Sequence, residues 1–273
     1  MRIVRFAIDG KARYGILDGG AIRSLQRSPF VGFQARGFRP HLDGSRHLLN
    51  KVRLLSPCSP SKLVCLGVNY RSHAIETGLP IPPVPLLFLK PPTAVIGPED
   101  RIVLPRLEKR RVDYEAELGV VIGRRTKEIS KERAKDCVLG YTCFNDVSER
   151  YAQKSDGQWT RCKGYDTFAP IGPWIETDVD PDDLMVESYL NGEVRQSART
   201  SDLIFGVAAI VSFISRHVTL EPGDLIFTGT PGTTTQIQPG DVVEVELEGV
   251  GVLRNPVAAT PERAKGAKKR AKP

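Results

Sequence analysis

Apolar and polar residues alternate along Val112–Gly123, whose sequence is VDYEAELGVVIG. One alternate series is apolar, whereas Asp113, Glu115 and Glu117 begin the other. Because a strand directs successive side chains to opposite faces, this stretch predicts a strand with one apolar face and a row of carboxylates. Two explanations fit carboxylates aligned on one face: exposure to solvent, or a hard divalent cation that takes several carboxylate oxygens.

The segment Asp241–Gly249 repeats this alternation near the C-terminus, with valine and leucine on one face and glutamates on the other. No further acid, histidine and lysine accompany it, so we expect an exposed face there. Alternation alone therefore does not distinguish a metal site from a solvated strand. The glutamates concerned are Glu244, Glu246 and Glu248.

Short apolar runs separated by Asp-Gly turns predict a small β-rich domain at residues 1–56, in which Ser28–Arg53 is expected to be irregular. A linker punctuated by prolines leads into a main domain, residues 57–259. Residues 260–273 are a basic tail that we expect to be disordered. The N-terminal strands are predicted at Ile3–Ala7, Tyr14–Leu17 and Ala21–Leu25.

The main domain contains short apolar strand patterns and one long helical stripe. Asp202–Arg216 has apolar residues at helical spacing and predicts a helix packed on the core. Ser130–Asp136 predicts a short helix that Ser130 caps. Strands are predicted at Lys62–Val68, Leu86–Lys90, Val138–Phe144, Met185–Leu190 and Leu225–Thr228.

With 40% hydrophobic and 26% charged residues, the 273-residue chain is typical of a globular protein. It has no apolar run near the roughly 18 residues of a membrane span, and its N-terminus does not resemble a signal peptide. We therefore expect a cytoplasmic protein without a membrane partner. The five cysteines are scattered and contain no C-x-x-C pair, which favours idle thiols over disulfides, a structural zinc site or a catalytic thiol.

The net charge of +7 is concentrated at the C-terminus. Residues 262–273 hold six basic residues and one acid, a net of +5, which leaves +2 for the rest of the chain. Such a tail could contact nucleic acid or another polyanion, but a solubilising terminus is the simpler interpretation.

His73 and Glu76 lie three residues apart after the strand predicted at Lys62–Val68. On a helical turn they share a side, where the carboxylate can fix the histidine tautomer and raise its basicity, as in a general base. A surface histidine beside a surface glutamate is the alternative. The proline-rich segment Leu79–Pro85 follows, and an extended loop of this kind can close over a site.

Further polar residues follow the later strands. Asp146 comes just after a strand, where an acid can reach a neighbouring strand's site, and Arg150 and Gln153 follow at helical spacing. Lys163 lies in a loop and matters only if it faces the acids. Thr230 lies in a glycine-rich turn, where a hydroxyl can hold a carboxylate.

Together these motifs resemble the fumarylacetoacetate hydrolase family, from about Lys62 to Val257, whose bacterial members also have a short N-terminal domain. Their order is specific for the family but not for the substrate. The motifs are N-Y-x-x-H-x-x-E, D-Y-E-x-E-L-x-x-V-I-G, G-Y-T-x-x-N-D-V-S-x-R-x-x-Q, W-T-R-x-K-x-x-D-T-F-x-P-x-G-P, N-G-E-x-R-Q, P-G-D-x-I-x-T-G-T-P and G-D-x-V-E-V-E.

The resemblance implies an α+β, β-rich fold in which a mixed β-roll or barrel forms the catalytic domain beside the small N-terminal β domain. It implies Mg²⁺ or Mn²⁺ bound by Glu115, Glu117 and Asp146. Asn69 stands where some relatives have a fourth carboxylate, so three protein ligands plus waters are expected. All-oxygen ligation fits these cations and disfavours zinc. Asp113 drops out of the site and is expected to be structural.

The resemblance also assigns roles to the other candidates. His73 and Glu76 match the family's catalytic dyad, on a segment that orders when substrate binds, and Lys163 would stabilise an enolate together with the metal. We expect a homodimer on the resemblance alone. The substrate-binding positions fall on Arg150, Gln153 and Thr230.

The implied substrate is a small 2-oxo acid or diacid that chelates the metal through its keto and carboxylate oxygens. Three routes share the enolate: hydrolysis of an acylpyruvate, decarboxylation of oxaloacetate, and isomerisation of 5-carboxymethyl-2-hydroxymuconate or 2-hydroxyhepta-2,4-diene-1,7-dioate. The dyad favours hydrolysis or decarboxylation, and we take acylpyruvate hydrolysis, with His73 activating water, as the expected reaction.

Two other classes of function remain. An inactive metal-binding homologue would need none of His73, Glu76 and Lys163, so their presence argues against it. A nucleic-acid binder acting through the basic tail would lose its function when residues 262–273 are removed. We expect turnover of the small substrate to survive that truncation, which a kinetic comparison of the full-length and shortened chains would test.

Overall fold

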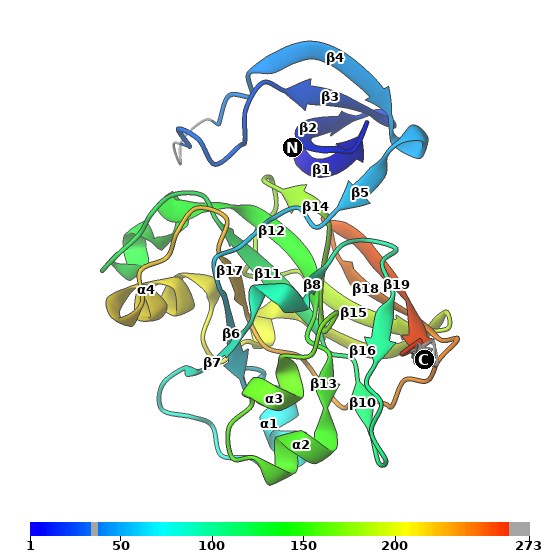
Figure 1. The fold of residues 1–273 in the computed structure, drawn as a ribbon. Coiled ribbons are helices and arrows are strands. Elements are labelled where there is room, and N and C mark those ends of the chain that lie inside the picture. Colours follow the sequence, from blue (N-terminus) through cyan, green and yellow to red (C-terminus); the bar gives the residue numbers. More distant parts are fainter. Residues whose placement is uncertain (34–37, 262–273) are drawn as a thin grey trace, which may run out of the picture.

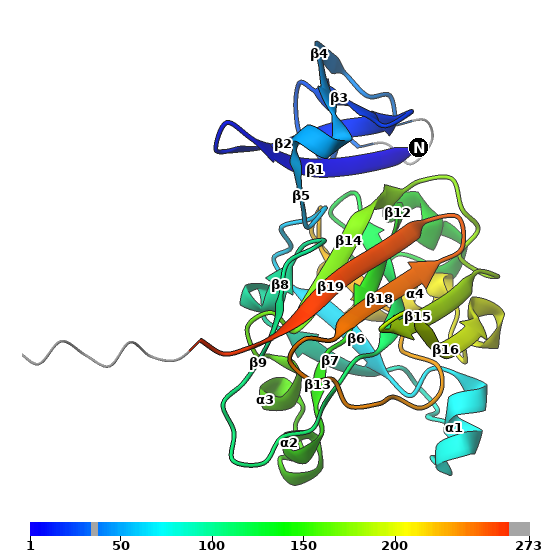
Figure 2. The same cartoon turned by 90° about the vertical axis from the view of Figure 1, so that its right-hand side faces the viewer.

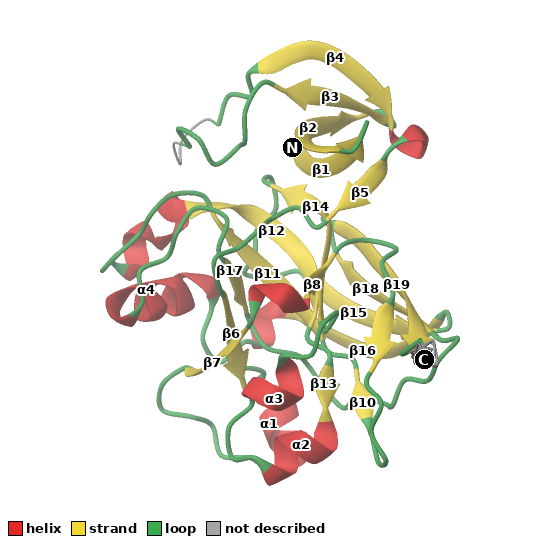
Figure 3. Cartoon of the chain, viewed as in Figure 1, coloured by secondary structure: helices red, strands yellow, loops and turns green. Residues whose placement is uncertain are grey.

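The computed structural model describes residues 1–33 and 38–261, so most of the predicted tail, residues 262–273, lies outside the described residues. The fold is dominated by strands, with short helices at its edges (Figure 3). This confirms the β-rich, α+β fold class. None of the described helices is long and apolar enough to cross a membrane.

The N-terminal strands form an antiparallel meander, as their Asp-Gly turns predict. The stretch predicted to be irregular nevertheless contains a strand that pairs with β3. Its sequence, LDGSRHL, has leucines only at its ends, so no alternation marks it, and pairing decides its conformation. The elements are β1 (Arg2–Ile8), β2 (Lys11–Asp18), β3 (Ala21–Leu25), β4 (Leu42–Leu48), η1 (Leu49–Lys51) and β5 (Arg53–Leu55).

The largest sheet runs from these strands into the main body, because β1 pairs with β14 (Figure 1). Its order is β4-β3-β2-β1-β14-β12-β11-β17-β6-β7, and it is mixed, since β17 and β6 are parallel. Off this path, β5 pairs with β1 and β8 with β14. The new strands are β6 (Leu63–Gly67), β7 (Leu86–Lys90), β8 (Val95–Ile96), β11 (Ala116–Ile122), β12 (Val138–Asn145), β14 (Ala169–Glu176) and β17 (Leu225–Phe227).

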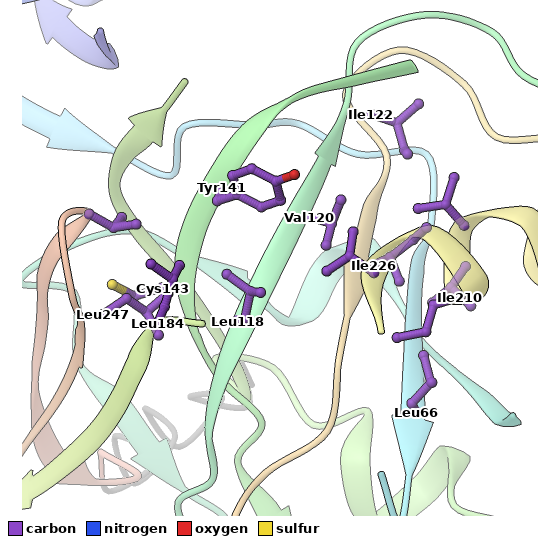
Figure 4. Close-up of a cluster of buried hydrophobic side chains, with 14 of the residues drawn as sticks. Leu66, Leu118, Val120, Ile122, Tyr141, Cys143, Leu184, Ile210, Ile226 and Leu247 are labelled. Carbon is purple, nitrogen blue, oxygen red and sulfur yellow. The ribbon is translucent and has the colours of Figure 1, made fainter. Parts of the chain in front are cut away.

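A second, five-stranded sheet packs beside the first in the order β16-β15-β18-β19-β9 (Figure 2). A buried apolar cluster joins the two sheets and the longest helix, α4 (Figure 4). A third sheet consists of β10 and β13 alone. The strands are β9 (Ile102–Leu104), β10 (Val112–Asp113), β13 (Ser148–Glu149), β15 (Met185–Leu190), β16 (Glu193–Arg199), β18 (Val242–Leu247) and β19 (Gly251–Ala259).

The predicted long helix begins later than its apolar pattern. A 3-10 turn, η4 (Thr200–Asp202), comes first, and α4 spans Val207–His217 after Gly206. The intervening Leu203 forms a β-bridge with Tyr70, which holds this segment out of the helix. The predicted short helix is η3 (Lys131–Cys137), and the Ser130 side chain makes no cap hydrogen bond, so that detail was wrong.

Three short helices gather at the end of the main body that lies opposite the N-terminal strands (Figure 1). They carry or flank most of the candidate residues outside the strands. These helices are α1 (Arg71–Thr77), α2 (Arg150–Ser155) and α3 (Thr160–Lys163), and η2 (Pro92–Ala94) follows β7.

Candidate active site

The acidic stretch around which the site is built forms two strands rather than one. β10 ends at Asp113 and β11 begins at Ala116, so Glu115 lies in the break and Glu117 in β11, and both are buried. Glu115 is only 6% exposed and Glu117 only 1%, which rules out the solvated-face explanation for this strand. In β11, Ala116 and the alternate residues after it enter one apolar cluster, whereas Val121 enters another, as the alternation predicts.

Three carboxylates converge at this point. Glu115 and Glu117 come from the β11 side, and Asp146 follows β12 directly. The β11–β12 register pairs Ala116 with Asn145, and the Asp146 N–H donates to the Glu115 carbonyl at 2.9 Å, which places Asp146 beside Glu115. One oxygen of each side chain lies within 4.8 Å of the others.

The look-alike strand β18 behaves differently. Glu248, just after the strand, is exposed as predicted, whereas Glu244 and Glu246 are half-buried rather than fully exposed. Across the described ranges 1–33 and 38–261, the carboxylate cluster of β11 is the one group of its kind that could hold a metal ion.

Two buried lysines contact the carboxylate cluster. Lys163 Nζ lies 2.7 Å from Glu115 Oε2 and 2.6 Å from Asp146 Oδ2. Lys90 Nζ lies 2.5 Å from Asp146 Oδ1. Lys163 therefore faces the acids, which is the condition under which a role in the site was predicted for it. Lys90 was missed, although a lysine that ends an otherwise apolar strand, LLFLK, was a signal.

The positively charged side chains around the cluster affect the pKa values of its carboxyl groups unequally. Burial tends to raise the pKa of Glu115, but Lys163 and Arg150 outweigh it and lower that pKa to about 2. Burial, followed by the charges of Asp146 and Glu115, raises the pKa of Glu117 well above its usual value. Among the described residues, the partner of the Glu117 carboxyl is the Gly229 N–H, at 2.8 Å.

This donor set fits a hard divalent cation. Glu117 is a buried carboxyl group forced towards protonation by two neighbouring carboxylates, and a cation among the three would relieve that repulsion. Asn69 does not add a ligand, because its amide is committed to backbone groups: it donates to Thr228 O at 2.7 Å and accepts from Phe205 N at 2.9 Å.

A cavity of about 680 Å³ opens against the cluster. It brings together seven of the nine candidate residues. Asp146 lies behind the cavity wall and is reached through Lys163, whereas Glu76 is exposed and does not line the cavity. The candidates that line it are His73, Glu115, Glu117, Arg150, Gln153, Lys163 and Thr230.

The predicted contact between His73 and Glu76 does not form in this structure. Helix α1 places His73 at the cavity, but within residues 1–33 and 38–261 its buried Nδ1 has no hydrogen-bond partner. A spacing of three residues on a helix permits a contact without requiring one, and here the Glu76 side chain lies in solvent.

Arg150 is anchored among acidic and polar groups. Its Nη1 lies 2.6 Å from Glu115 Oε1, and its Nε donates to Asp113 Oδ2 at 2.9 Å. It also donates to Gln153 Oε1 and Thr234 Oγ1. Asp113 lines the cavity, so the expectation that it lies outside the site does not hold, although it does act structurally by holding Arg150.

An aromatic wall, Phe88 and Trp159, closes one side of the cavity. The two rings meet edge to face with centroids 5.1 Å apart, and Lys163 Nζ lies 5.1 Å from the Phe88 centroid. Gly67 leaves room for the indole, since a Cβ there would lie 2.6 Å from a Trp159 ring carbon. No sequence pattern predicted that these two rings line the site.

The cysteines take no part in this cavity wall, because none of the five is among its lining residues. All five are buried thiols. Burial raises the pKa of Cys65 well above its ordinary value, as it does for Cys143, and neutral buried thiols are poor nucleophiles. This agrees with the prediction of idle thiols.

Two family models cover most of the chain. The model described as fumarylacetoacetate (FAA) hydrolase C-terminal matches residues 62–258, and the one described as Rv2993c-like, N-terminal, matches residues 1–57.

Curated relatives align over nearly the full length. Protein Rv2993c from Mycobacterium tuberculosis is 46% identical over 94% of this chain and 98% of its own. A 2,4-didehydro-3-deoxy-L-rhamnonate hydrolase from a Sphingomonas species is 39% identical over 94% of this chain and 96% of its own. The mitochondrial oxaloacetate tautomerase fahd2 of Xenopus laevis is 40% identical over 94% and 90%.

Solved structures share the whole fold. The 2-hydroxyhepta-2,4-diene-1,7-dioate isomerase from Mycobacterium marinum is 45% identical, with a TM-score of 0.87 over 96% of this chain and 100% of that one. The maleylpyruvate hydrolase from Sphingobium sp. SYK-6, in complex with manganese(II) ion and pyruvate, is 30% identical, with a TM-score of 0.79 over 96% and 100%. A family model matches most of the chain, relatives align with it over nearly their full length, and the motif residues converge on one site. This chain therefore belongs to the fumarylacetoacetate hydrolase family.

Proposed function

We propose that this protein is a divalent-metal-dependent enzyme that hydrolyses a C–C bond of a small 2-oxo acid of the acylpyruvate type. The observation that carries the proposal is the cluster of three buried carboxylates, facing a cavity and flanked by the buried Lys163. The donor set favours Mg²⁺ or Mn²⁺. A relative that was solved with manganese and pyruvate supports the same choice of metal and of 2-oxo acid.

The side chains around the cavity suit this chemistry. When bound by Glu115, Glu117 and Asp146, the cation would supply Lewis acidity to the oxygens of the 2-oxo acid. Lys163 presents a fixed positive charge at the cavity wall, because burial is outweighed by Asp146 and Glu115, which raise its pKa. This ammonium can stabilise the negative charge that develops on the substrate when the C–C bond breaks.

His73 is the candidate for proton transfer. It lines the cavity, and its buried Nδ1 has no protein partner within the described part of the chain. It would accept the proton of the water that attacks the acyl carbonyl, which is worth roughly 10²–10⁴-fold in rate. Gln153 and Thr230, which both line the cavity, could offer an amide and a hydroxyl to the substrate carboxylate.

Isomerisation or tautomerisation of a 2-oxo acid is the second candidate. The separation of Glu76 from His73 favours it, because a proton shift between carbon atoms requires no water activated by a dyad. Relatives with isomerase and oxaloacetate tautomerase names support it as well. Oxaloacetate decarboxylation uses the same 2-oxo acid site and remains the third route.

A substrate panel tests the choice of reaction. Acetylpyruvate, fumarylpyruvate, oxaloacetate and 5-carboxymethyl-2-hydroxymuconate would be supplied with Mg²⁺ or Mn²⁺, while pyruvate release, carbon dioxide release and isomerisation are followed separately. We expect kcat/KM for pyruvate release from an acylpyruvate to exceed the others at least tenfold, and His73→Ala to lower it by roughly 10²-fold or more. Isomerisation of the diacid without pyruvate release would instead establish the second candidate.

Gly67→Ala provides a test of the aromatic wall. The added Cβ would meet Trp159 ring carbons at 2.6 and 2.7 Å, so the indole must move at the cavity edge just before the helix that carries Lys163. We expect kcat/KM to fall by roughly tenfold, because a small misplacement of a catalytic group is costly. Gly206→Ala is the matched control, since a Cβ there meets nothing within 4 Å. Equal kinetics in the two variants would exclude the wall from function.

A further inference from the structure

We propose that Lys90 is a positioning residue that sets the orientation of the Asp146 carboxylate; this inference rests on the proposed metal-dependent function. Lys90 ends β7 and is 1% exposed. Its Nζ lies 2.5 Å from Asp146 Oδ1 and donates to the Val147 carbonyl at 3.1 Å. It does not line the cavity, so it acts on the substrate only through Asp146.

Asp146 depends on lysines for the direction of its side chain. Within the described residues, its carboxylate accepts two hydrogen bonds: Oδ1 from Lys90 and Oδ2 from Lys163. The terminal torsion of an aspartate is broad, so the carboxylate plane turns easily unless its oxygens are held. Lys90, which does not line the cavity, holds Oδ1, whereas Lys163, which does, holds Oδ2.

A second lysine–aspartate pair, in which the aspartate is buried and the lysine is half-buried, shows what a purely structural arrangement looks like in this fold. Asp224 is fully buried and pairs with Lys62, but it also accepts from the backbone N–H groups of Ser61, Lys62 and Glu221. Its carboxylate would therefore stay in place without the lysine. Asp146 has no such backbone donors among the described residues, so the loss of Lys90 removes half of its restraints.

Lys90→Met tests this role, with Lys62→Met as the matched control. Methionine preserves most of the side-chain length and removes the ammonium. Calorimetric titration with Mn²⁺ and steady-state kinetics would be measured for both variants. For Lys90→Met we expect Mn²⁺ affinity to fall roughly 10–100-fold and kcat to fall similarly, with KM within about threefold, as for other residues that orient a metal ligand. Lys62→Met should lower the melting temperature but leave Mn²⁺ affinity and kcat close to wild type.

The direction of the change in affinity is decisive. Removing a positive charge beside the carboxylates would by Coulomb's law alone strengthen cation binding, so weaker binding identifies orientation as the role of Lys90. Unchanged or stronger Mn²⁺ binding by Lys90→Met would overturn the positioning role. In that case the proposed function would still stand, provided that the wild-type protein binds Mn²⁺ and turns over its substrate. A wild-type protein that binds no Mn²⁺ would overturn both.

Lys90→Gln covers the outcome in which the methionine variant does not fold. Glutamine retains an N–H donor on a shorter, neutral side chain, so we expect Mn²⁺ affinity between that of Lys90→Met and that of wild type. If circular dichroism shows that neither variant folds whereas Lys62→Met does, Lys90 is required for the fold itself, and the positioning role is overturned.

Discussion

Glu117→Gln should abolish turnover and weaken Mn²⁺ binding by at least roughly 100-fold, yet leave the metal-stripped protein no less stable than the wild type. Burial and the charges of Asp146 and Glu115 raise the pKa of Glu117 well above its usual value, so glutamine removes a negative charge that the fold disfavours when no cation is bound. Glutamine also keeps an oxygen for the Gly229 N–H. Calorimetric Mn²⁺ titration and chemical unfolding in EDTA would measure the two effects.

The difference in stability between Glu117→Gln and the wild type should depend on pH, in a direction set by the raised pKa of Glu117. A carboxyl group whose pKa is raised by folding binds its proton more tightly in the native state, so its ionisation destabilises the fold as pH rises above the ordinary glutamate pKa. In EDTA, the stability of Glu117→Gln relative to the wild type should therefore increase as the pH is raised from acidic to alkaline values. Glu246→Gln, from the half-buried look-alike strand, should change neither metal binding nor this profile. Full activity in Glu117→Gln would be incompatible with a three-carboxylate site.

Lys163→Met should lower kcat by roughly 10²–10³-fold and cost the metal-stripped protein about 3–5 kcal/mol of unfolding free energy. The reason is that Lys163 is a buried partner of both Glu115 and Asp146, and its removal leaves those carboxylates without that positive charge in a desolvated site. Turnover of the preferred acylpyruvate and urea unfolding in EDTA would be measured.

Added Mn²⁺ should recover stability in Lys163→Met to a greater extent than it stabilises the wild type, because the cation supplies the positive charge that the variant lacks. Arg161→Met is the matched control, since Arg161 lies two residues earlier on α3 and pairs with Asp156 on the exposed surface. It should leave turnover and Mn²⁺ binding unchanged. A Lys163→Met protein with wild-type stability and kcat would remove Lys163 from the site.

Regular patterns in the sequence predicted the regular parts of the fold. The alternation in β11 and the Asp-Gly turns between β1, β2 and β3 correspond to observed elements, because local chemistry determines them. β4 could not be predicted in this way, since its polar sequence becomes a strand only through pairing with β3. The start of α4 was also misplaced, because a bridge between Leu203 and Tyr70 overrides the helical pattern.

The candidate site was likewise predicted only in part. Alternation alone gave the same prediction for Glu115 and Glu117 as for Glu244, Glu246 and Glu248. In the sequence only the neighbouring motifs separated the two sets, and in the structure the burial of Glu115 and Glu117 and the register of β11 with β12 separate them. Motif order, through the family resemblance, supplied the other candidates. Lys90 and Asp113 were missed or misplaced, because their roles depend on which partners the fold brings to them.

Removal of the metal from the wild-type enzyme tests the central claim most directly. The protein would be dialysed against EDTA, assayed with its preferred acylpyruvate, and assayed again after addition of Mn²⁺ or Mg²⁺. We expect the stripped enzyme to retain less than about 1% of its activity and either cation to restore it, because the three buried carboxylates hold the Lewis acid on which the reaction depends. Full activity after EDTA treatment would contradict this account.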